Sequence, residues 1–171
     1  NATRRGFGLQ KLLYDSSAWV RTGAINNGAN CSEYPIEEAR GNIAVAKALI
    51  NNGYFLDEFC TSEKRILRLA VARKLDTSPS YFRVADKMKE DPDFYIRSTL
   101  AAKGYNPMTY MKDPDKRVRT ITASTGPKDI VKDLINDPDE DVRAALAFRG
   151  VELDILINDP SNPHSPLSAG S

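Results

Sequence analysis

The sequence is poor in the residues that carry most metal and nucleophilic chemistry. Its 171 residues include one histidine, His164, and two cysteines, Cys31 and Cys60. A Ser-His-Asp triad, an HExxH zinc site or a histidine-rich metal cage is therefore close to excluded. The two cysteines form no CxxC pair and cannot close a zinc site by themselves. We expect no enzymatic activity, no bound metal and no cofactor.

Long apolar runs and net charge are also missing. No apolar stretch approaches the roughly 20 residues that a transmembrane helix needs. The basic first residues are followed by no apolar core of the kind that a secretory signal contains. Lysine plus arginine number 24 against 23 acidic residues, whereas constitutive nucleic-acid binders usually carry a large basic excess. Together with the isolated cysteines, these features predict a soluble, cytoplasmic protein.

What the sequence does contain is an internal repeat. Residues 91–112, 113–136 and 137–158 share the pattern D-P-D-x-x-(V/I)-R-x-x-x-A-x-x-G, and each continues into a short apolar stretch. Their lengths are 22, 24 and 22 residues, and Asp159-Pro160 opens a fourth unit. Units this short cannot bury an apolar face alone, so neighbouring units must stack.

The apolar-arginine pair extends this repeat towards the N-terminus. Aligned on it, the arginine column comprises Arg21, Arg40, Arg68, Arg97, Arg119 and Arg143, with spacings of 19, 28, 29, 22 and 24 residues. We divide the chain into an N-terminal cap (1–14), irregular helical repeats (15–90), regular repeats (91–158) and a Pro/Ser-rich tail (159–171). The regular half therefore follows an irregular one.

Each regular unit is expected to begin with a capped helix. We expect Asp137 to cap the helix, with Pro138 at the first helical position and Glu140 at the third. An apolar stripe at helical spacing follows, and its members Leu100, Val118, Val142 and Leu146 should be buried. Glycines seven residues after the arginine should end these helices, namely Gly28, Gly104, Gly126 and Gly150.

A second short helix should complete each unit. We expect these helices at Tyr54–Phe59, Tyr81–Glu90, Met108–Lys112, Asp129–Asn136 and Leu153–Asn158. The sequence therefore predicts an all-α fold, a short solenoid of about six two-helix units.

The 22–24-residue period with DPDxxVRxxLA resembles the leucine-rich repeat variant family and, more loosely, HEAT-like repeats. The match is specific over residues 91–158 and weaker over 15–90. This resemblance implies a right-handed helical-repeat solenoid that serves as a binding scaffold. Some members of the family carry a cysteine-rich iron–sulfur module. Cys31 and Cys60 cannot supply four thiolates, so the resemblance carries over the fold without the cluster.

The arginine column has two interpretations. In one, a row of guanidinium groups grips phosphates or acidic side chains of a partner. In the other, each arginine binds a capping aspartate or carbonyl oxygens of an adjacent unit. Arginine and aspartate recur together, which favours a structural, inter-repeat role. This role is assigned to Arg21, Arg68, Arg97, Arg119, Arg143, Asp91, Asp113 and Asp137.

The aspartates at the helix starts also suggest calcium. Asp137, Asp139 and Asp141 occupy alternate positions, as in an EF-hand loop. Val142, however, stands where that loop needs glycine, and Phe148 stands where it needs a bidentate glutamate. The pattern therefore favours helix capping over a metal site.

Aromatic residues mark the clearest departure from the repeat. The two positions before the apolar-arginine pair are polar in 113–136 and 137–158, but elsewhere they hold Trp19, Phe94 and Tyr95. Uniform stacking would place these aromatics on the solvated side of the first helix, where they could anchor a partner. Alternatively, Trp19 covers an irregular end and the other two fill space left by a longer unit.

Three functional hypotheses follow. The first is a non-enzymatic protein-interaction module, whose curved face binds a protein or peptide. The alternative is a nucleic-acid-binding HEAT-like protein, since residues 1–75 hold 11 basic and 7 acidic residues, whereas the remainder holds 13 and 16. A hydrolase using Asp57 and Glu58 ranks last because adjacent helical residues point in different directions. Departures from the regular repeat concentrate before residue 97, so we place the binding surface in the N-terminal half.

Overall fold

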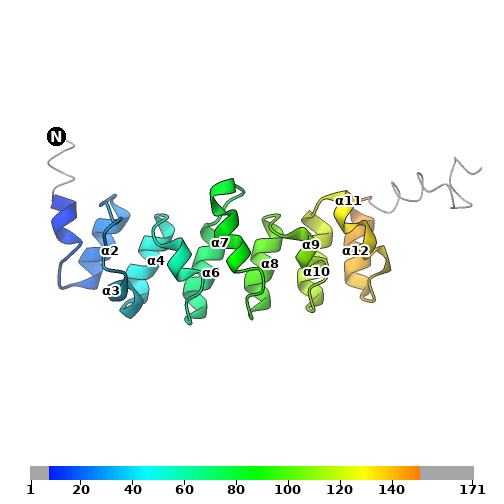
Figure 1. Cartoon of the computed structure of the whole chain (residues 1–171), viewed down its shortest axis with the longest axis horizontal. Coiled ribbons are helices and arrows are strands. Elements are labelled where there is room, and N and C mark those ends of the chain that lie inside the picture. Colours follow the sequence, from blue (N-terminus) through cyan, green and yellow to red (C-terminus); the bar gives the residue numbers. More distant parts are fainter. Residues whose placement is uncertain (1–7, 151–171) are drawn as a thin grey trace, which may run out of the picture. The chain divides into compact units, whose positions relative to one another are not determined.

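The structure, a computed structural model, describes residues 8–150, and every regular element in that range is a helix. The predicted all-α class is therefore confirmed for these residues (Figure 1). The chain forms two compact units, Asn1–Asp76 and Thr77–Ser171, which we call unit 1 and unit 2. None of the described helices has the length and apolar character that crossing a bilayer requires.

Unit 1 is built around longer helices that pack side by side in chain order. These are α2 (Ala18–Asn26), α4 (Ile43–Asn51) and α6 (Arg65–Lys74), connected through the shorter α3 (Ile36–Gly41) and α5 (Leu56–Phe59). α2 packs on α4, and α4 packs on α6. Residues 8–12 are also helical.

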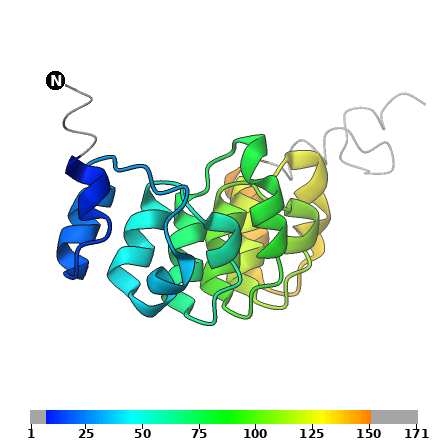
Figure 2. The same ribbon diagram turned by 60° about the vertical axis from the view of Figure 1, so that its left-hand side comes forward.

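Unit 2 repeats this arrangement. Its longer helices are α8 (Phe94–Ala102), α10 (Lys116–Thr125) and α12 (Glu140–Phe148), and α10 packs between the other two. Both views show these three helices side by side (Figures 1 and 2). The shorter elements are η1 (Pro79–Tyr81), α7 (Phe82–Lys87), α9 (Pro107–Tyr110), α11 (Lys128–Val131) and η2 (Lys132–Asn136).

The expected second helices overlap with short elements of the structure. The segments at Tyr54–Phe59, Tyr81–Glu90 and Met108–Lys112 contain or overlap α5, α7 and α9. The segment at 129–136 coincides with most of α11 and with η2. The helix expected at 153–158 and the tail at 159–171 lie outside the described residues.

The long helices of unit 2 begin later than the sequence predicts. The second aspartate of each Asp-Pro-Asp is the cap, and Asp139 accepts a 3.0 Å hydrogen bond from the Asp141 backbone N–H. The first aspartate, Asp137, accepts instead from the Asp139 backbone N–H at 2.9 Å. Pro138 therefore precedes the cap, and the capping box expected for Glu140 is wrong. An Asp-x-Asp motif offers two possible caps, and Asp137 is already engaged in turning the chain.

Counting from the capping residue corrects the alignment in unit 1. The arginine lies four residues after the cap in α2 and α6, as it does throughout unit 2. In α4, whose cap is Asn42, the same position holds the buried Ala46. Arg40 lies in the short α3 and is exposed, so its place in the arginine column is wrong. The pair Ala39-Arg40 imitates the motif because α3 also buries one small residue.

Three of the four glycines expected to end the long helices do so with positive φ. These angles are +92° at Gly28, +81° at Gly104 and +68° at Gly150, where a side chain would be strained. Gly126 differs, with a φ of −68°. A Cβ atom there would lie 2.7 Å from Val131 Cγ1, so this position needs glycine for space.

The predicted apolar anchors are buried. Leu100, Val118, Val142 and Leu146 are each no more than 1% exposed. In unit 2, Val142 and Leu146 belong to a cluster of buried residues that also contains Met111, Ala123, Val131 and Leu134. Long and short helices therefore share one core, as the short apolar stretches require.

Candidate interaction surface

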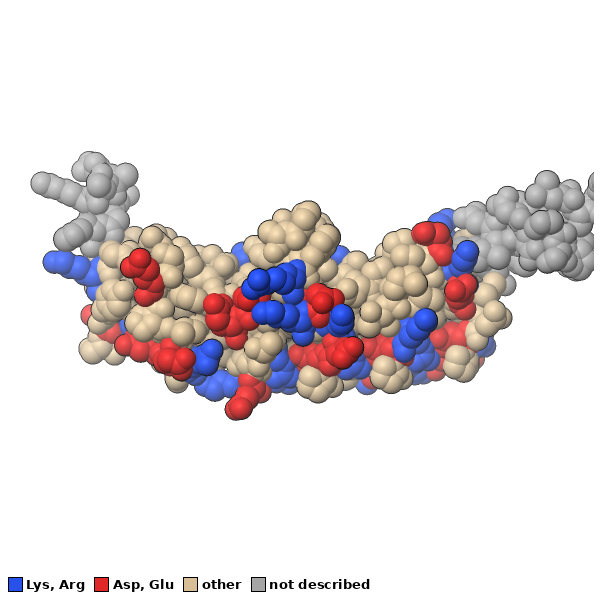
Figure 3. All heavy atoms as spheres, viewed as in Figure 1, with Lys and Arg blue, Asp and Glu red and all other residues tan. Residues whose placement is uncertain are grey.

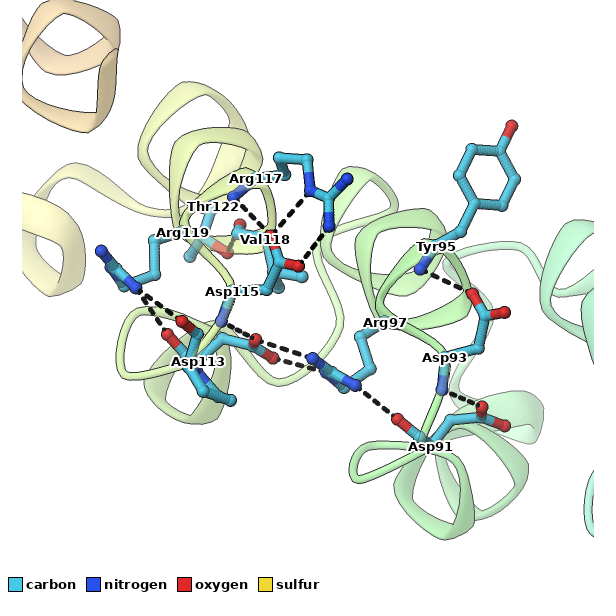
Figure 4. A network of polar contacts seen from close by, with 11 residues as sticks. Asp91, Asp93, Tyr95, Arg97, Asp113, Asp115, Arg117, Val118, Arg119 and Thr122 are labelled. Carbon is cyan, nitrogen blue, oxygen red and sulfur yellow. Dashed lines mark hydrogen bonds and ion pairs between the residues drawn. The ribbon is translucent and has the colours of Figure 1, made fainter. Parts of the chain in front are cut away.

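The arginines of unit 2 join successive repeats from within. Arg97 donates from Nε and Nη2 to the two carboxylate oxygens of Asp113, at 2.7 and 3.0 Å. Its Nη1 donates to the Asp91 carbonyl oxygen at 2.6 Å. Arg119 repeats the pattern on Asp137 and on the Asp113 carbonyl oxygen. Figure 4 shows how these side chains connect consecutive helix starts.

Burial makes these ion pairs more than surface contacts. The Asp113 and Asp137 side chains are almost fully buried, and their arginine partners are mostly covered. The bond to Asp137 raises the pKa of Arg119, although burial opposes this. Burial would raise the pKa of Asp137, but bonds from Arg119 and the Asp139 N–H, with the charges of Arg119 and Arg143, hold it below its usual value.

The same column in unit 1 binds carbonyl oxygens. Arg21 donates to the carbonyls of Asp15 and Ser16, and Arg68 donates to those of Ser62 and Glu63. In unit 2, Arg143 likewise donates to the Asp137 carbonyl. The predicted structural arginines therefore hold the turns before their own helices, which leaves them poorly placed to grip a partner's phosphates.

An exposed apolar row crosses the starts of the long helices in unit 1. Trp19, two residues after the cap of α2, is 84% exposed. Ile43, one residue after the cap of α4, is 42% exposed, and Ile66, two residues after the cap of α6, is 45% exposed. The three residues lie near the starts of helices that pack side by side, and we call them the apolar row.

Sequence reasoning found Trp19 but missed the two isoleucines. Ile43 was missed because the alignment used Arg40 as the repeat arginine, which puts the start of the repeat helix in α3 and not in α4. Ile66 precedes the apolar-arginine pair Leu67-Arg68 directly, the position that Trp19 shares with respect to Arg21. Alignment on the caps would have revealed Ile66, whereas Ile43 lies one position nearer its cap than Trp19 and Ile66 do.

The two aromatics predicted as binding residues in unit 2 lie in different environments. The Arg117 guanidinium covers Phe94, with its central carbon 3.4 Å from the ring centroid. Such a stack stabilises the folded chain and blocks one ring face. Tyr95 is 44% exposed, and its ring points away from the polar network in Figure 4. Tyr95 is therefore the more accessible of the two.

The corresponding positions further along unit 2 are charged. Arg117 forms a bidentate contact with Asp115, which lowers the pKa of that carboxyl to about 2. Lys116 Nζ lies 3.0 Å from both Asp139 and Asp141, and bonds to these two carboxylates raise its pKa. Figure 3 shows acidic and basic side chains alternating along the edge below α8, α10 and α12. These charges largely satisfy one another within unit 2.

Two open grooves also lie on unit 2. One of about 590 Å³ runs between α10 and α12, lined by Thr120, Ala144 and Phe148 among others. The other, of about 660 Å³, lies between α7 and the start of α9, where Phe82 meets Tyr105 edge-on with centroids 5.7 Å apart. Both are shallow surface features.

The remaining polar candidates have local bonds in the structure. Asp139 accepts a backbone hydrogen bond in the helix cap, and no group of three metal-ligating side chains capable of holding an ion occurs within residues 8–150. Cys31 and Cys60 are both buried free thiols, and burial raises the pKa of Cys31. Asp57 and Glu58 lie next to each other in the short α5.

Comparison with known proteins does not identify a family for this chain. No protein-family model, curated protein or solved structure matches the chain.

Proposed function

We propose that this protein is a non-enzymatic interaction module whose binding surface is centred on the apolar row of unit 1. The exposure of Trp19 carries this proposal. Tryptophan buries a large area on binding and is enriched among the residues that dominate protein interfaces. Ile43 and Ile66 extend the same surface across two further helices, so Trp19 is part of a patch.

We also propose that the chain is a helical-repeat solenoid of the leucine-rich repeat variant kind, with about six units. What supports this is the frame shared by both units, in which a turn, a capping position and an apolar stripe recur at 22–29-residue intervals. Repeat scaffolds bind partners through extended rows of side chains contributed by successive repeats. The apolar row has this form.

A pull-down with quantitative mass spectrometry tests the proposed function. Lysate of the source cells is passed over the immobilised wild-type chain, the Trp19→Ala variant and a Met108→Ala variant. Met108 is an exposed apolar residue of α9 in unit 2 and serves as the matched control. We expect a protein retained by wild type and Met108→Ala but depleted about tenfold on Trp19→Ala. Equal recovery on all three would overturn the proposal.

Nucleic-acid binding stays the alternative, and one observation favours it. The helices α2, α4 and α6 contain lysine and arginine but no acidic residue. Against it, the arginines Arg21 and Arg68 donate to backbone carbonyls of their own turns. Binding of this kind would weaken steeply with salt, which a gel shift at low and physiological salt would measure.

A further inference from the structure

We propose that the groove between α10 and α12 is a second binding site, which takes a peptide segment of another protein that carries a carboxylate beside a bulky apolar side chain. The groove has a volume of about 590 Å³, with Lys116 at the helix-start end and Phe148 and Arg149 at the other end. It belongs to unit 2 and shares no residue with the apolar row, so this site goes beyond the proposed function.

The middle of the groove offers apolar surface to a partner. Phe148 is 93% exposed, and Ala144, about one turn earlier in α12, is also exposed. On the α10 side, the hydroxyls of Thr120 and Ser124 each donate a 2.9 Å hydrogen bond to the backbone carbonyl four residues earlier. These hydroxyls have no proton left to donate to a ligand. An apolar side chain that covers the Phe148 ring is therefore the favoured occupant of this part.

The cations at the helix-start end of the groove are already paired with carboxylates. Lys116 Nζ lies 3.0 Å from a carboxylate oxygen of Asp139 and 3.0 Å from one of Asp141. Arg117 donates from Nε and Nη2 to the two carboxylate oxygens of Asp115 (Figure 4). An acidic group of a partner would have to compete with these ion pairs, so this end does not favour one.

Arg149, at the other end, has a different environment. Its Nη1 donates to the Ala123 carbonyl oxygen at 2.5 Å, which links the end of α12 to α10. A carbonyl oxygen is neutral, so this bond holds the guanidinium in place without cancelling its charge. Within residues 8–150, no carboxylate pairs with Arg149. Because a guanidinium binds a carboxylate through two parallel N–H donors, charge complementarity favours an acidic group of the partner here.

The acidic residue that lines the groove does not oppose this placement. Asp141 and Arg149 are eight residues apart in sequence, which corresponds to about 12 Å along α12. This separation exceeds the Debye length of about 8 Å at physiological salt. The Asp141 carboxylate is also paired with Lys116. A carboxylate bound at Arg149 is therefore little affected by Asp141.

The shape and charge of the groove favour a protein segment over a small molecule or a nucleic acid. A small-molecule site encloses most of its ligand, whereas Phe148 projects into solvent. A nucleic-acid strand is held through several phosphates, each of which needs a cation. Among the described residues that line the groove, Arg149 is the one cation without a carboxylate partner. One carboxylate and one apolar side chain suit this arrangement.

Peptide phage display on the full chain tests the proposal. Random peptides of about 12 residues are selected in parallel on the immobilised wild-type chain and on its Phe148→Ala and Arg149→Gln variants. We expect the wild type to enrich a family of peptides with aspartate or glutamate within about two residues of leucine, isoleucine or phenylalanine. Neither variant should enrich this family.

Fluorescence anisotropy with one enriched, labelled peptide measures the loss of affinity. We expect Phe148→Ala and Arg149→Gln to weaken binding about tenfold each. On the wild-type chain, glutamine in place of the acidic residue of the peptide should also weaken binding about tenfold. On Arg149→Gln the same change in the peptide should have an effect within about twofold, because the two groups act on each other.

Matched variants outside the groove supply the controls. Arg143→Gln alters another arginine of α12, which is exposed and also donates to a backbone carbonyl. Phe82→Ala removes another exposed phenylalanine of unit 2. Both should leave the affinity for the peptide within about twofold of wild type. Circular dichroism checks that all the variants remain helical.

Several outcomes would overturn this second site. These are absence of a peptide family that depends on Phe148 and Arg149, enrichment of peptides without acidic residues, and tighter binding of a labelled single-stranded DNA than of the peptide. Hydrogen exchange provides a further one: faster exchange of residues 151–171 in Phe148→Ala than in wild type would mean that the chain itself covers the groove.

The second site and the proposed function fail separately. The Trp19-dependent protein of the pull-down needs neither Phe148 nor Arg149. If that protein is recovered and no peptide family is enriched, the interaction module stands and the second site is wrong. If the peptide family is enriched and no protein depends on Trp19, the second site stands and the apolar row is wrong.

Discussion

At the scale of single residues, the arginine column shows how one side chain can serve two repeats. Arg119 bonds the carboxylate that opens the next repeat and the carbonyl that opens its own. Both Asp137 oxygens are satisfied, and one also accepts the Asp139 N–H. A buried carboxylate with this many donors is stable only while all of them remain.

Removing Arg119 should therefore be costly. Arg119→Ala leaves Asp137 buried without its charged partner, and we expect a loss of about 3 kcal/mol in the free energy of unfolding measured in urea. The exposed ion pair of Lys89 with Asp86 offers a control, because Lys89→Ala breaks only a solvated contact and should cost much less. Similar losses for the two variants would show that burial does not set the strength of these pairs.

Acid should destabilise the protein through the same carboxylates. Asp115 has its pKa lowered to about 2, chiefly by Arg117, and the pKa of Asp137 is also lowered. A lowered pKa in the folded state means that the unfolded chain binds the proton more tightly, so stability is present above about pH 4 and is lost as the pH falls towards about 2. Unfolding measured between about pH 6 and pH 2 would reveal this.

The variant Asp115→Asn isolates one contribution to this acid sensitivity. It removes a carboxylate whose pKa is lowered to about 2, so the fall in stability below about pH 4 should be shallower than in wild type. An unchanged slope would mean that the acid sensitivity comes from other groups.

Single residues were predicted unevenly from sequence. The pairing of arginine with aspartate and the exposure of Trp19 follow from the repeat pattern, because equivalent positions show which residues depart from it. The contact between Arg117 and Phe94 does not follow from the repeat pattern. It joins side chains of neighbouring repeats, and residue spacing does not determine where those side chains lie.

At the scale of elements, the sequence indicates helices more reliably than their starts. Each Asp-Pro-Asp provides two carboxylates and a proline, all of which are favourable at a helix start. In the structure, Asp137 binds Arg119 and the Asp139 backbone N–H, and the second aspartate, Asp139, caps the helix. Similarly, Arg40 matches the arginine column by sequence because α3, a six-residue helix with one buried alanine, resembles a repeat start.

The two kinds of helix-ending glycine should lose different amounts of stability when they are replaced by asparagine. Gly104 has a φ of +81° and open space around it, so Gly104→Asn should cost less than about 1 kcal/mol because asparagine tolerates that conformation. Gly126 has an ordinary φ, but its Cβ would clash with Val131 and with the Thr122 carbonyl, so Gly126→Asn should cost several times more. Thermal melts of both variants make the comparison, which equal losses would contradict.

The buried apolar residues of α12 should be sensitive to shortening of their side chains. Leu146 is 1% exposed and packs in the core cluster with Val131 and Leu134. Leu146→Ala should therefore cost about 2–5 kcal/mol in the free energy of unfolding. The exposed Ala147 of the same helix provides a control, since Ala147→Ser should change stability by less than about 1 kcal/mol. A loss below about 1 kcal/mol for Leu146→Ala would show that the stripe is not the core of unit 2.

At the scale of the whole molecule, the two units use one local design for different surfaces. In unit 2 the helix starts carry paired charges, as at Arg117 with Asp115 and Lys116 with Asp141. In unit 1 the positions equivalent to Arg117 hold Trp19, Ala44 and Ile66, whereas Arg65 stands at the position of Lys116. Charges that satisfy one another offer little to a partner, whereas an exposed apolar side chain such as Trp19 can be buried by one. We therefore propose that unit 1 carries the binding surface, although Phe148 in unit 2 is itself 93% exposed.

The proposed surface predicts that two aromatic substitutions weaken partner binding to different extents. Trp19→Ala should weaken the captured partner more than Tyr95→Ala does, because the tryptophan is 84% exposed within the apolar row whereas the tyrosine is 44% exposed beside the covered Phe94. Both variants should shift the melting temperature by only a few degrees, since neither side chain is buried in the core. Titration calorimetry and thermal melts of the two variants measure these effects separately. If both substitutions unfold the protein, the aromatics belong to the core and the surface lies elsewhere. If Tyr95→Ala alone weakens binding, unit 2 carries the site.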